Sequence, residues 1–299
     1  MRAQDIVRLV VLAAIWGASF LFMRVIADAL GVMTTACSRV LIAGVVLCSW
    51  FAVAGIGVEW RRHWREYAVI GVVNSAVPFS LYAFAAQHIP ASYSAIMNSL
   101  APMFGMALGV VWLGARPSVV NLVGAVVGIA GVTVIAWKGP MELTGVRIVA
   151  ICACAAAAAC YAIAGVYMKK RAGHLRPIAV AGASQLVAGV VLLPGAVVWP
   201  APGPITPVVI GAALALALVC SGVAYVLYYR LLADCGPTRA LTVTYLIPVF
   251  GVLWSVVFLR EALTVEMVCG CALVVAGTML VVRKSGVARE KGAWKRAGP

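Results

Sequence analysis

Charged side chains are scarce in this 299-residue chain. Asp, Glu, Lys and Arg make up only 11% of it, whereas an average soluble domain carries about 25%. The mean hydropathy is +1.06, and blocks of about 20 apolar residues, enough to cross ~30 Å of hydrocarbon as a helix, follow one another with short polar breaks. This composition excludes a soluble protein and predicts an all-α integral membrane protein.

Catalytic and metal-binding motifs are also missing. The sequence lacks an H-E-x-x-H motif and paired aspartates within the apolar blocks, and its three histidines fall near block ends or in loops, at His63, His88 and His174. Nine cysteines invite a zinc interpretation, but Cys152/Cys154 and Cys269/Cys271 lack the C-x-x-C spacing of structural sites and read better as buried thiols. We therefore expect no enzyme, no cofactor and no metal site.

Acidic residues are absent from the centre of every predicted span. Asp28, Glu142 and Glu261 fall at outer ends and Asp234 at an inner end. An intramembrane carboxylate proton relay therefore has no carrier. Because export of cationic drugs usually requires such a carboxylate, this absence counts against a multidrug exporter.

What is present is a series of ten apolar blocks, each predicted to be a transmembrane helix. The blocks are Ile6 to Val25, Val32 to Ala54, Tyr67 to Gln87, Ala91 to Leu113, Val119 to Ala136, Ile148 to Met168, Ile178 to Trp199, Pro207 to Tyr229, Thr238 to Leu259 and Thr264 to Val282. An even number of spans places both termini on the same side of the membrane.

The distribution of Lys and Arg predicts which side that is. The side of the termini receives Arg2, Arg8, Arg61, Arg62, Arg65, Arg116, Lys169, Lys170, Arg171, Arg176, Arg230, Arg239 and the tail from Arg283 to Arg296, and the other side only Arg24, Lys138, Arg147 and Arg260. Lys and Arg accumulate on cytoplasmic loops, so we expect cytoplasmic termini. The net charge of +14 then indicates a lipid bilayer, not nucleic acid, as the partner, and the tail, 284–299, is an anchor or binds anionic lipid.

The chain repeats itself near half its length. The stretch from Leu100 to Gly105 aligns with that from Leu246 to Gly251, and without a gap Gly124 then aligns with Gly270. Each half, 1–137 and 146–283, holds five predicted spans. An odd number inverts the second half relative to the first, so we expect two inverted five-helix repeats with a binding site between them near the bilayer midplane.

Prolines in three spans each follow a polar residue by four positions. The pairs are Asn74/Pro78, Asn98/Pro102 and Thr244/Pro248. A proline frees the carbonyl four positions earlier, so these helices are predicted to bend or open at mid-depth, with the prolines as hinges. Simple packing kinks are the alternative.

Polar and aromatic residues at this depth define the expected substrate cavity. They are Trp16, Ser19, Arg39, Asn74, Tyr82, Asn98, Tyr161, Gln185, Tyr228, Thr244 and Tyr245. Arg39 either holds a substrate carboxylate or reaches back to the outer interface. The fifth and tenth spans have few polar residues, and the Gly124-x-x-x-Gly128 spacing of the fifth fits a structural or homodimer-forming helix.

Together these residues resemble the EamA-like branch of the drug/metabolite transporter superfamily. The resemblance rests on Trp16 to Phe20, Arg39, Pro102 with Leu113-Gly114, Pro248, Leu259 to Glu261, Gly270 and Gly277. It implies ten helices in inverted repeats and export of amino acids or other metabolites across the bacterial inner membrane. Ala115 departs from the acidic residue usual at that position, which Glu261 keeps in the second half, and Tyr161 replaces a frequent tryptophan.

We therefore expect a secondary transporter that exports small metabolites such as amino acids by alternating access. The alternatives are a multidrug exporter and a membrane sensor or scaffold that transports nothing.

Overall fold

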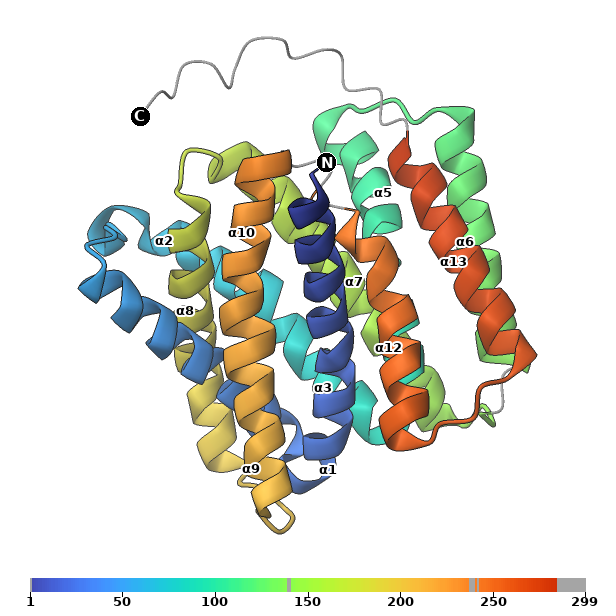
Figure 1. Cartoon of the computed structure of the whole chain (residues 1–299), viewed down its shortest axis with the longest axis horizontal. Helices are drawn as coiled ribbons and strands as arrows, with labels where there is room; N and C mark the ends of the chain where they lie inside the picture. Colours follow the sequence, from blue (N-terminus) through green and yellow to red (C-terminus); the bar gives the residue numbers. More distant parts are fainter. Residues whose placement is uncertain (1, 139–140, 237–239, 241, 284–299) are drawn as a thin grey trace.

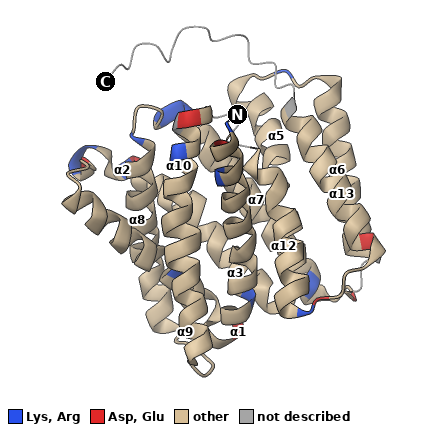
Figure 2. Ribbon diagram, viewed as in Figure 1, with Lys and Arg blue, Asp and Glu red and all other residues tan. Residues whose placement is uncertain are grey.

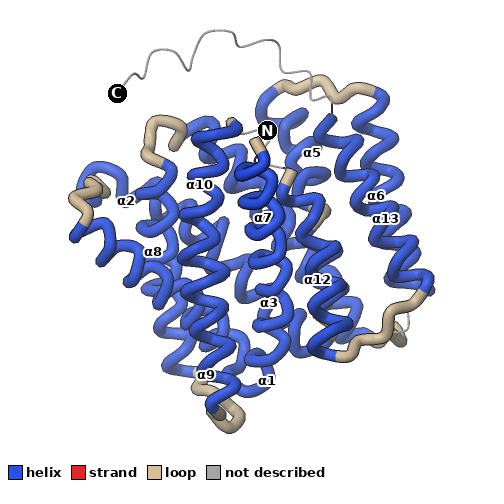
Figure 3. The backbone as a smooth tube through the Cα atoms, viewed as in Figure 1, coloured by secondary structure: helices blue, strands red, loops and turns tan. Residues whose placement is uncertain are grey.

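Helices make up almost all of the chain, as lipid requires when it offers no partners to backbone polar groups. The computed structural model describes residues 2–138, 141–236, 240 and 242–283, and in these residues it shows helices and loops without a strand (Figure 3). This confirms the predicted all-helical class. The predicted basic tail, 284–299, lies outside the described residues, as does Arg239.

The helices follow one another along the chain with short connections (Figure 1). They are α1 (Ala3–Val53), α2 (Trp60–Gly71), η1 (Val72–Ala76), α3 (Val77–His88), α4 (Ala91–Asn98), α5 (Ala101–Leu113), α6 (Val119–Lys138), α7 (Gly145–Arg171), α8 (Pro177–Val198), α9 (Pro207–Leu214), η2 (Ala215–Val223), α10 (Ala224–Cys235), α12 (Val243–Leu259) and α13 (Val265–Arg283). Within the described residues, eight helices are long and apolar enough to cross a membrane, and α12 is a shorter apolar helix.

The first two predicted helices form one element, α1. Straight, its 51 residues would extend about 75 Å, more than twice the thickness of a hydrocarbon core. The helix is instead interrupted at Gly31, whose φ of 72° suits glycine because it has no Cβ, and the chain reverses direction there (Figure 1). Within the described residues the structure therefore shows eight or nine apolar helices, one of which, α1, consists of two arms.

Two of the three predicted proline openings coincide with breaks in helical geometry. The π-helical segment η1 ends just before Pro78, and α4 ends at Asn98, three residues before α5 begins. By contrast, α12 runs through Pro248. A second π-helical segment, η2, contains no proline, so this irregularity had no signal in the sequence.

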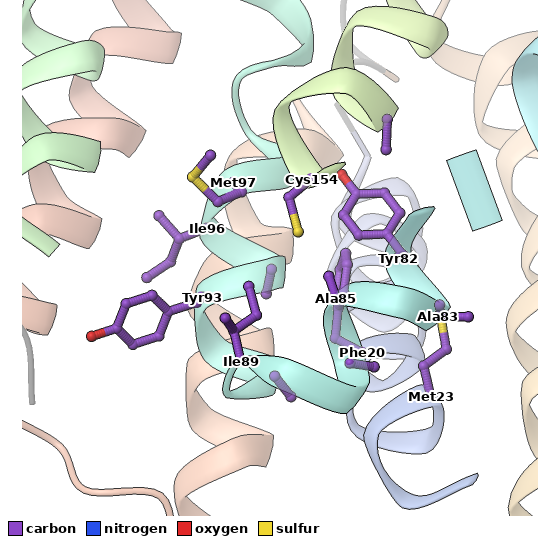
Figure 4. Packing of buried hydrophobic residues seen from close by; sticks show 14 of the residues in the cluster. Phe20, Met23, Tyr82, Ala83, Ala85, Ile89, Tyr93, Ile96, Met97 and Cys154 are labelled. Atoms are coloured by element: carbon purple, nitrogen blue, oxygen red, sulfur yellow. The ribbon is translucent and has the colours of Figure 1, made fainter. Parts of the chain in front are cut away.

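The main core lies where α1, α3, α4 and α7 meet. Figure 4 shows Phe20, Tyr82, Ile96 and Cys154 gathered there. Of the paired cysteines, Cys154 is buried as expected, whereas Cys152 and Cys269 are exposed on the outside of the bundle, so the buried-thiol reading was wrong for those two.

The outer surface has the character of a lipid-facing protein. Large apolar side chains are exposed along the helices, among them Val111, Val126 and Trp199, while charged residues gather toward the two ends of the bundle (Figure 2). An apolar band between charged ends matches the cross-section of a bilayer. The chain is thus a multi-pass integral membrane protein.

Glycines hold α6 and α13 in close contact along one side of the bundle (Figure 1). A Cβ at Gly124 would lie 2.7 Å from the Gly277 carbonyl oxygen, and one at Gly131 would lie 2.7 Å from the Gly270 carbonyl oxygen. The predicted Gly124-x-x-x-Gly128 packing face is therefore occupied by α13 of the same chain. Gly124 and Gly270, which the internal repeat aligns, both lie in this contact, each opposite a different glycine.

Candidate functional site

A cavity of about 640 Å³ lies inside the bundle. Its lining comes from α1, α2, η1, α3, α4, α5, α7, α8, η2, α10 and α12, with a contribution from the ends of α6 and α13. This volume falls in the range of small-molecule sites, about 300–1,000 Å³. Helices from both halves of the chain therefore enclose one space large enough for a metabolite.

Most of the residues predicted to bind substrate line this cavity. They are Trp16, Ser19, Arg39, Asn74, Tyr82, Asn98, Tyr161, Tyr228 and Thr244, and the predicted hinge Pro102 joins them. Gln185, Tyr245, Pro78 and Pro248 are not in the lining. Gln185 is fully buried in α8, and Tyr245 is buried in α12.

Arg39 is held in the second arm of α1 by contacts from three other segments. Its Nε donates to Ser221 Oγ of η2 at 3.1 Å, and its Nη1 lies 3.3 Å from the sulfur of Met23. The guanidinium carbon lies 3.8 Å from the centre of the Phe79 ring in α3, in the range of a cation–π contact. With only 7% of its surface exposed, Arg39 points into the protein and does not reach an interface.

Within the part of the chain that the structure describes, no carboxylate pairs with this arginine. Among the residues that the structure describes, the Arg–carboxylate pairs are Arg8 with Asp5 and Asp234, Arg24 with Asp28, and Arg62 with Glu59. A buried cation without a counter-ion is costly unless something else compensates it. Every charged residue in the described lining of the cavity is cationic, namely Arg39, Arg116 and Lys169. The cavity is therefore electrostatically prepared for a negative group.

Aromatic rings form much of the wall around Arg39. The ring of Trp16 lies 5.4 Å from that of Tyr228 and 6.4 Å from that of Tyr225, measured between centroids. On the other side, Phe20 meets Tyr82 edge-on at 5.4 Å, in the usual spacing of aromatic pairs. These rings offer apolar surface and hydroxyl groups together, which suits an amphipathic ligand.

A side-chain hydrogen bond links the parts of the lining that α3 and α4 contribute. The Tyr82 hydroxyl donates to Asn98 Oδ1 at 3.1 Å. Asn98 is the last residue of α4, next to the break before α5. Because the bond uses the amide oxygen, it directs the amide nitrogen of Asn98 toward other acceptors.

The cavity is asymmetric with respect to the two ends of the bundle. Its lining extends to Arg116, in the loop after α5, and to Lys169, in the last turn of α7. Both helices end on the side of the bundle where the N-terminus lies (Figure 1). At the opposite end, Glu261 accepts hydrogen bonds from the backbone N–H groups of Ala91 and Ser92 at 2.7 and 3.2 Å. A carboxylate at a helix N-terminus is a stabilising cap, so α4 is fixed to the segment that follows α12.

Four residues of the site were missing from the predicted set of substrate-binding residues. Phe79 is an apolar residue without any signal of function in the sequence, and Ser221 lies in the unpredicted segment η2. Arg116 was counted only among the cations on the side of the termini. The fourth is Tyr225, and the i, i+4, i+7 spacing of Ser221, Tyr225 and Tyr228 places these three on one face of their span.

Comparisons with known proteins agree on one family. The model of the EamA-like transporter family matches residues 6–137 and again 148–283, and the double match suggests a repeat. A solved crystal structure aligns over 95% of this chain and 98% of its own with a TM-score of 0.67 and 17% identity, which shows a shared fold.

Individual relatives are distant but span most of the chain. One is "Uncharacterized transporter YvbV" of Bacillus subtilis, 24% identical over 75% of this chain and 74% of the relative. Another is "Probable terminal-alkyne amino-acid exporter" of Streptantibioticus cattleyicolor, 26% identical over 93% of each chain. A third is "Protein PecM" of Dickeya dadantii, 24% identical over 93% of this chain and 92% of the relative.

Proposed function

The chain belongs to the EamA-like transporter family, and from this premise we propose that it exports small carboxylate-bearing metabolites, such as amino acids, across the bacterial inner membrane. It is a transporter and not an enzyme. The proposal concerns the substrate, the direction of transport and the mechanism, which is alternating access between two halves of the chain.

The observation that carries the proposal is the buried Arg39, which pairs with no carboxylate of the described residues. A substrate carboxylate can form two parallel hydrogen bonds with a guanidinium, and it would supply the negative charge that the cavity lacks. The Nε of Arg39 donates to Ser221, and the guanidinium lies over the ring of Phe79. These contacts fix the orientation of the guanidinium before a ligand arrives. Such pre-organisation lowers the entropic cost of binding.

Amino acids fit the remainder of the cavity. Their side chains would contact the rings of Trp16, Phe20 and Tyr82, and their ammonium group would be received by hydroxyl, amide and aromatic groups. The relative from Streptantibioticus whose name includes amino-acid export supports this class. A cationic drug, the substrate of the multidrug alternative, would meet Arg39, Arg116 and Lys169 without a compensating carboxylate in the described lining.

In the proposed architecture the chain crosses the membrane ten times, in two inverted halves, 1–137 and 146–283. The two arms of α1 on either side of Gly31 count as separate crossings, and α12 counts as one despite its length. The excess of Lys and Arg on the side of both termini supports a cytoplasmic location for that side.

Alternating access would then use the asymmetry of the cavity. With cytoplasmic termini, the lining that extends to Arg116 and Lys169 corresponds to an inward-facing state, and the cap that Glu261 places on α4 keeps the outer end together. The breaks near Pro78 and Pro102 are the proposed hinges, with Pro248 as the third.

Counterflow in proteoliposomes tests the substrate and the role of Arg39 together. Purified protein is reconstituted into vesicles loaded with one unlabelled amino acid, and uptake of the same labelled amino acid is followed for a panel of side chains. We expect saturable exchange for the wild type and its loss in Arg39→Gln, because the amide cannot pair with a carboxylate as an ion.

Arg24→Gln is the matched control, since Arg24 lies on the same element but pairs with Asp28 at 2.8 Å outside the cavity. It should retain exchange. Exchange that persists in Arg39→Gln would remove Arg39 from the site, and exchange of cationic drugs in place of amino acids would favour the multidrug alternative. A correctly inserted protein that exchanges nothing would favour a sensor or scaffold.

A further inference from the structure

Two of the three histidines in the chain lie side by side, although they come from different halves. His63 belongs to α2, and His174 lies in the turn between α7 and α8. Their ring centroids are 5.1 Å apart. Glu66 lies three residues after His63, on the same face of α2, and one ligand atom from each of the three side chains lies within 4.8 Å of the other two.

We infer that His63, Glu66 and His174 form a binding site for a divalent transition-metal ion, with zinc as the best match. Two imidazole nitrogens and one carboxylate oxygen are a common zinc ligand set, with a fourth position left for water. Magnesium and calcium prefer all-oxygen sites, so they are excluded as the preferred ions. No sequence motif indicates this site, because His174 is far from His63 and Glu66 along the chain.

The geometry needs only a small closure to bind zinc. Ligand atoms at about 2.0–2.2 Å from a tetrahedral zinc ion lie roughly 3.4 Å from one another, compared with the 4.8 Å that bounds the three groups here. His63 is buried, while His174 is exposed in a turn. A turn can move its side chain toward a fixed partner at low cost, so His174 supplies the adjustable ligand.

The backbone conformation of Glu59, beside His63, is a second observation that supports the site. Glu59, at the start of α2, has a φ of 47°, a left-handed conformation that is uncommon for a residue with a side chain. Its Oε2 lies 3.8 Å from the Nε2 of His63. Strained backbone tends to persist at functional positions, and a second carboxylate beside His63 adds negative charge that a metal ion would neutralise.

Zinc titration of the intact protein is the direct test. The full chain, purified with a tag that contains no histidine and stripped with a chelator, is titrated with Zn²⁺ in competition with a chromophoric chelator. We expect one equivalent to bind to the wild type. His63→Ala and His174→Ala should lose that equivalent or bind it at least about tenfold more weakly, because each removes one of only three ligands. An excess of Mg²⁺ should not displace the zinc.

His88→Ala is the matched control. The His88 ring contacts the Phe84 carbonyl of its own helix at 2.8 Å, away from the cluster, so this variant should bind zinc as the wild type does. X-ray absorption at the zinc edge should show nitrogen and oxygen neighbours. Absence of a stoichiometric site, equal binding by the His63 and His174 variants, or sulfur neighbours from the chain's free cysteines would each overturn the assignment.

Discussion

Glu261 accepts hydrogen bonds from both the backbone N–H and the hydroxyl of Ser92, 169 residues away in the chain. Glu261 belongs to the second region matched by the family model, 148–283, and Ser92 to the first, 6–137. Because the same carboxylate also accepts from the N–H of Ala91 at 2.7 Å, it caps α4 from across the interface between the two regions. At the aligned position of the first region the chain has Ala115, which cannot form an equivalent cap.

Removal of this cap should loosen the end of the bundle opposite the termini. In Glu261→Ala, three hydrogen bonds to one carboxylate are lost, and the cost expected for an N-terminal cap is about 0.5–2 kcal/mol. The thermal unfolding midpoint of the detergent-solubilised protein should fall accordingly. Glu142→Ala is the control, because Glu142 is exposed and only its backbone carbonyl accepts a hydrogen bond, from Arg147. Equal midpoints for the two variants would mean that the cap contributes nothing.

Arg39 should reduce the stability of the protein while it serves transport. Burial of an ion carries a desolvation cost of several kcal/mol, and no carboxylate of the described residues offsets it at Arg39. Arg39→Met should therefore raise the unfolding midpoint in the absence of substrate, even though it should abolish exchange. Arg24→Met removes only an exposed pair and should change the free energy of unfolding by less than about 1 kcal/mol. A lower midpoint for Arg39→Met would show that its contacts to Ser221 and Phe79 outweigh the cost of burying the charge.

Much of the fold could be predicted because membrane spans leave a direct signal in apolar length. What could not be predicted depends on backbone conformation. Gly31 gives no signal that α1 continues on both sides of it, and η2 becomes π-helical without a proline. In both places neighbouring helices determine the local geometry, and a single sequence does not reveal those neighbours.

The candidate site could be predicted to the extent that polar residues in apolar blocks point inward. This reasoning placed Asn74, Asn98 and Arg39 among the residues that line the cavity. It failed for Gln185, which is polar and buried but does not line the cavity. It also missed Phe79, which is apolar but lies against the guanidinium of Arg39. Distinguishing the lining of a cavity from the layer behind it requires the rotation of each helix, which composition does not fix.

The hydrogen bond between Tyr82 and Asn98 should tune substrate affinity. Tyr82→Phe removes the hydroxyl donor but keeps the ring that packs on Phe20. Loss of one such bond corresponds to about 1 kcal/mol, so the half-saturation concentration in counterflow should rise about fivefold. Tyr93→Phe is the control, since the Tyr93 hydroxyl lies 3.4 Å from the Ile135 carbonyl, outside the cavity lining. An unchanged half-saturation concentration in Tyr82→Phe would show that Asn98 does not depend on this bond.

Close packing of α6 on α13 should make Gly277 intolerant of any side chain. A Cβ there would approach the backbone of Gly128, with its Cα at 2.7 Å, and backbone cannot move aside as a flexible side chain can. Overpacking of this kind costs about 1–3 kcal/mol, so Gly277→Ala should lower the unfolding midpoint. Gly211→Ala is the matched control, because Gly211 also lies in a helix but a Cβ there would meet open space, and alanine favours a helix over glycine by up to about 1 kcal/mol. The two substitutions add the same methyl group, so a midpoint that falls in the first and holds or rises in the second locates the effect at the α6–α13 contact, whereas equal midpoints would contradict that close packing.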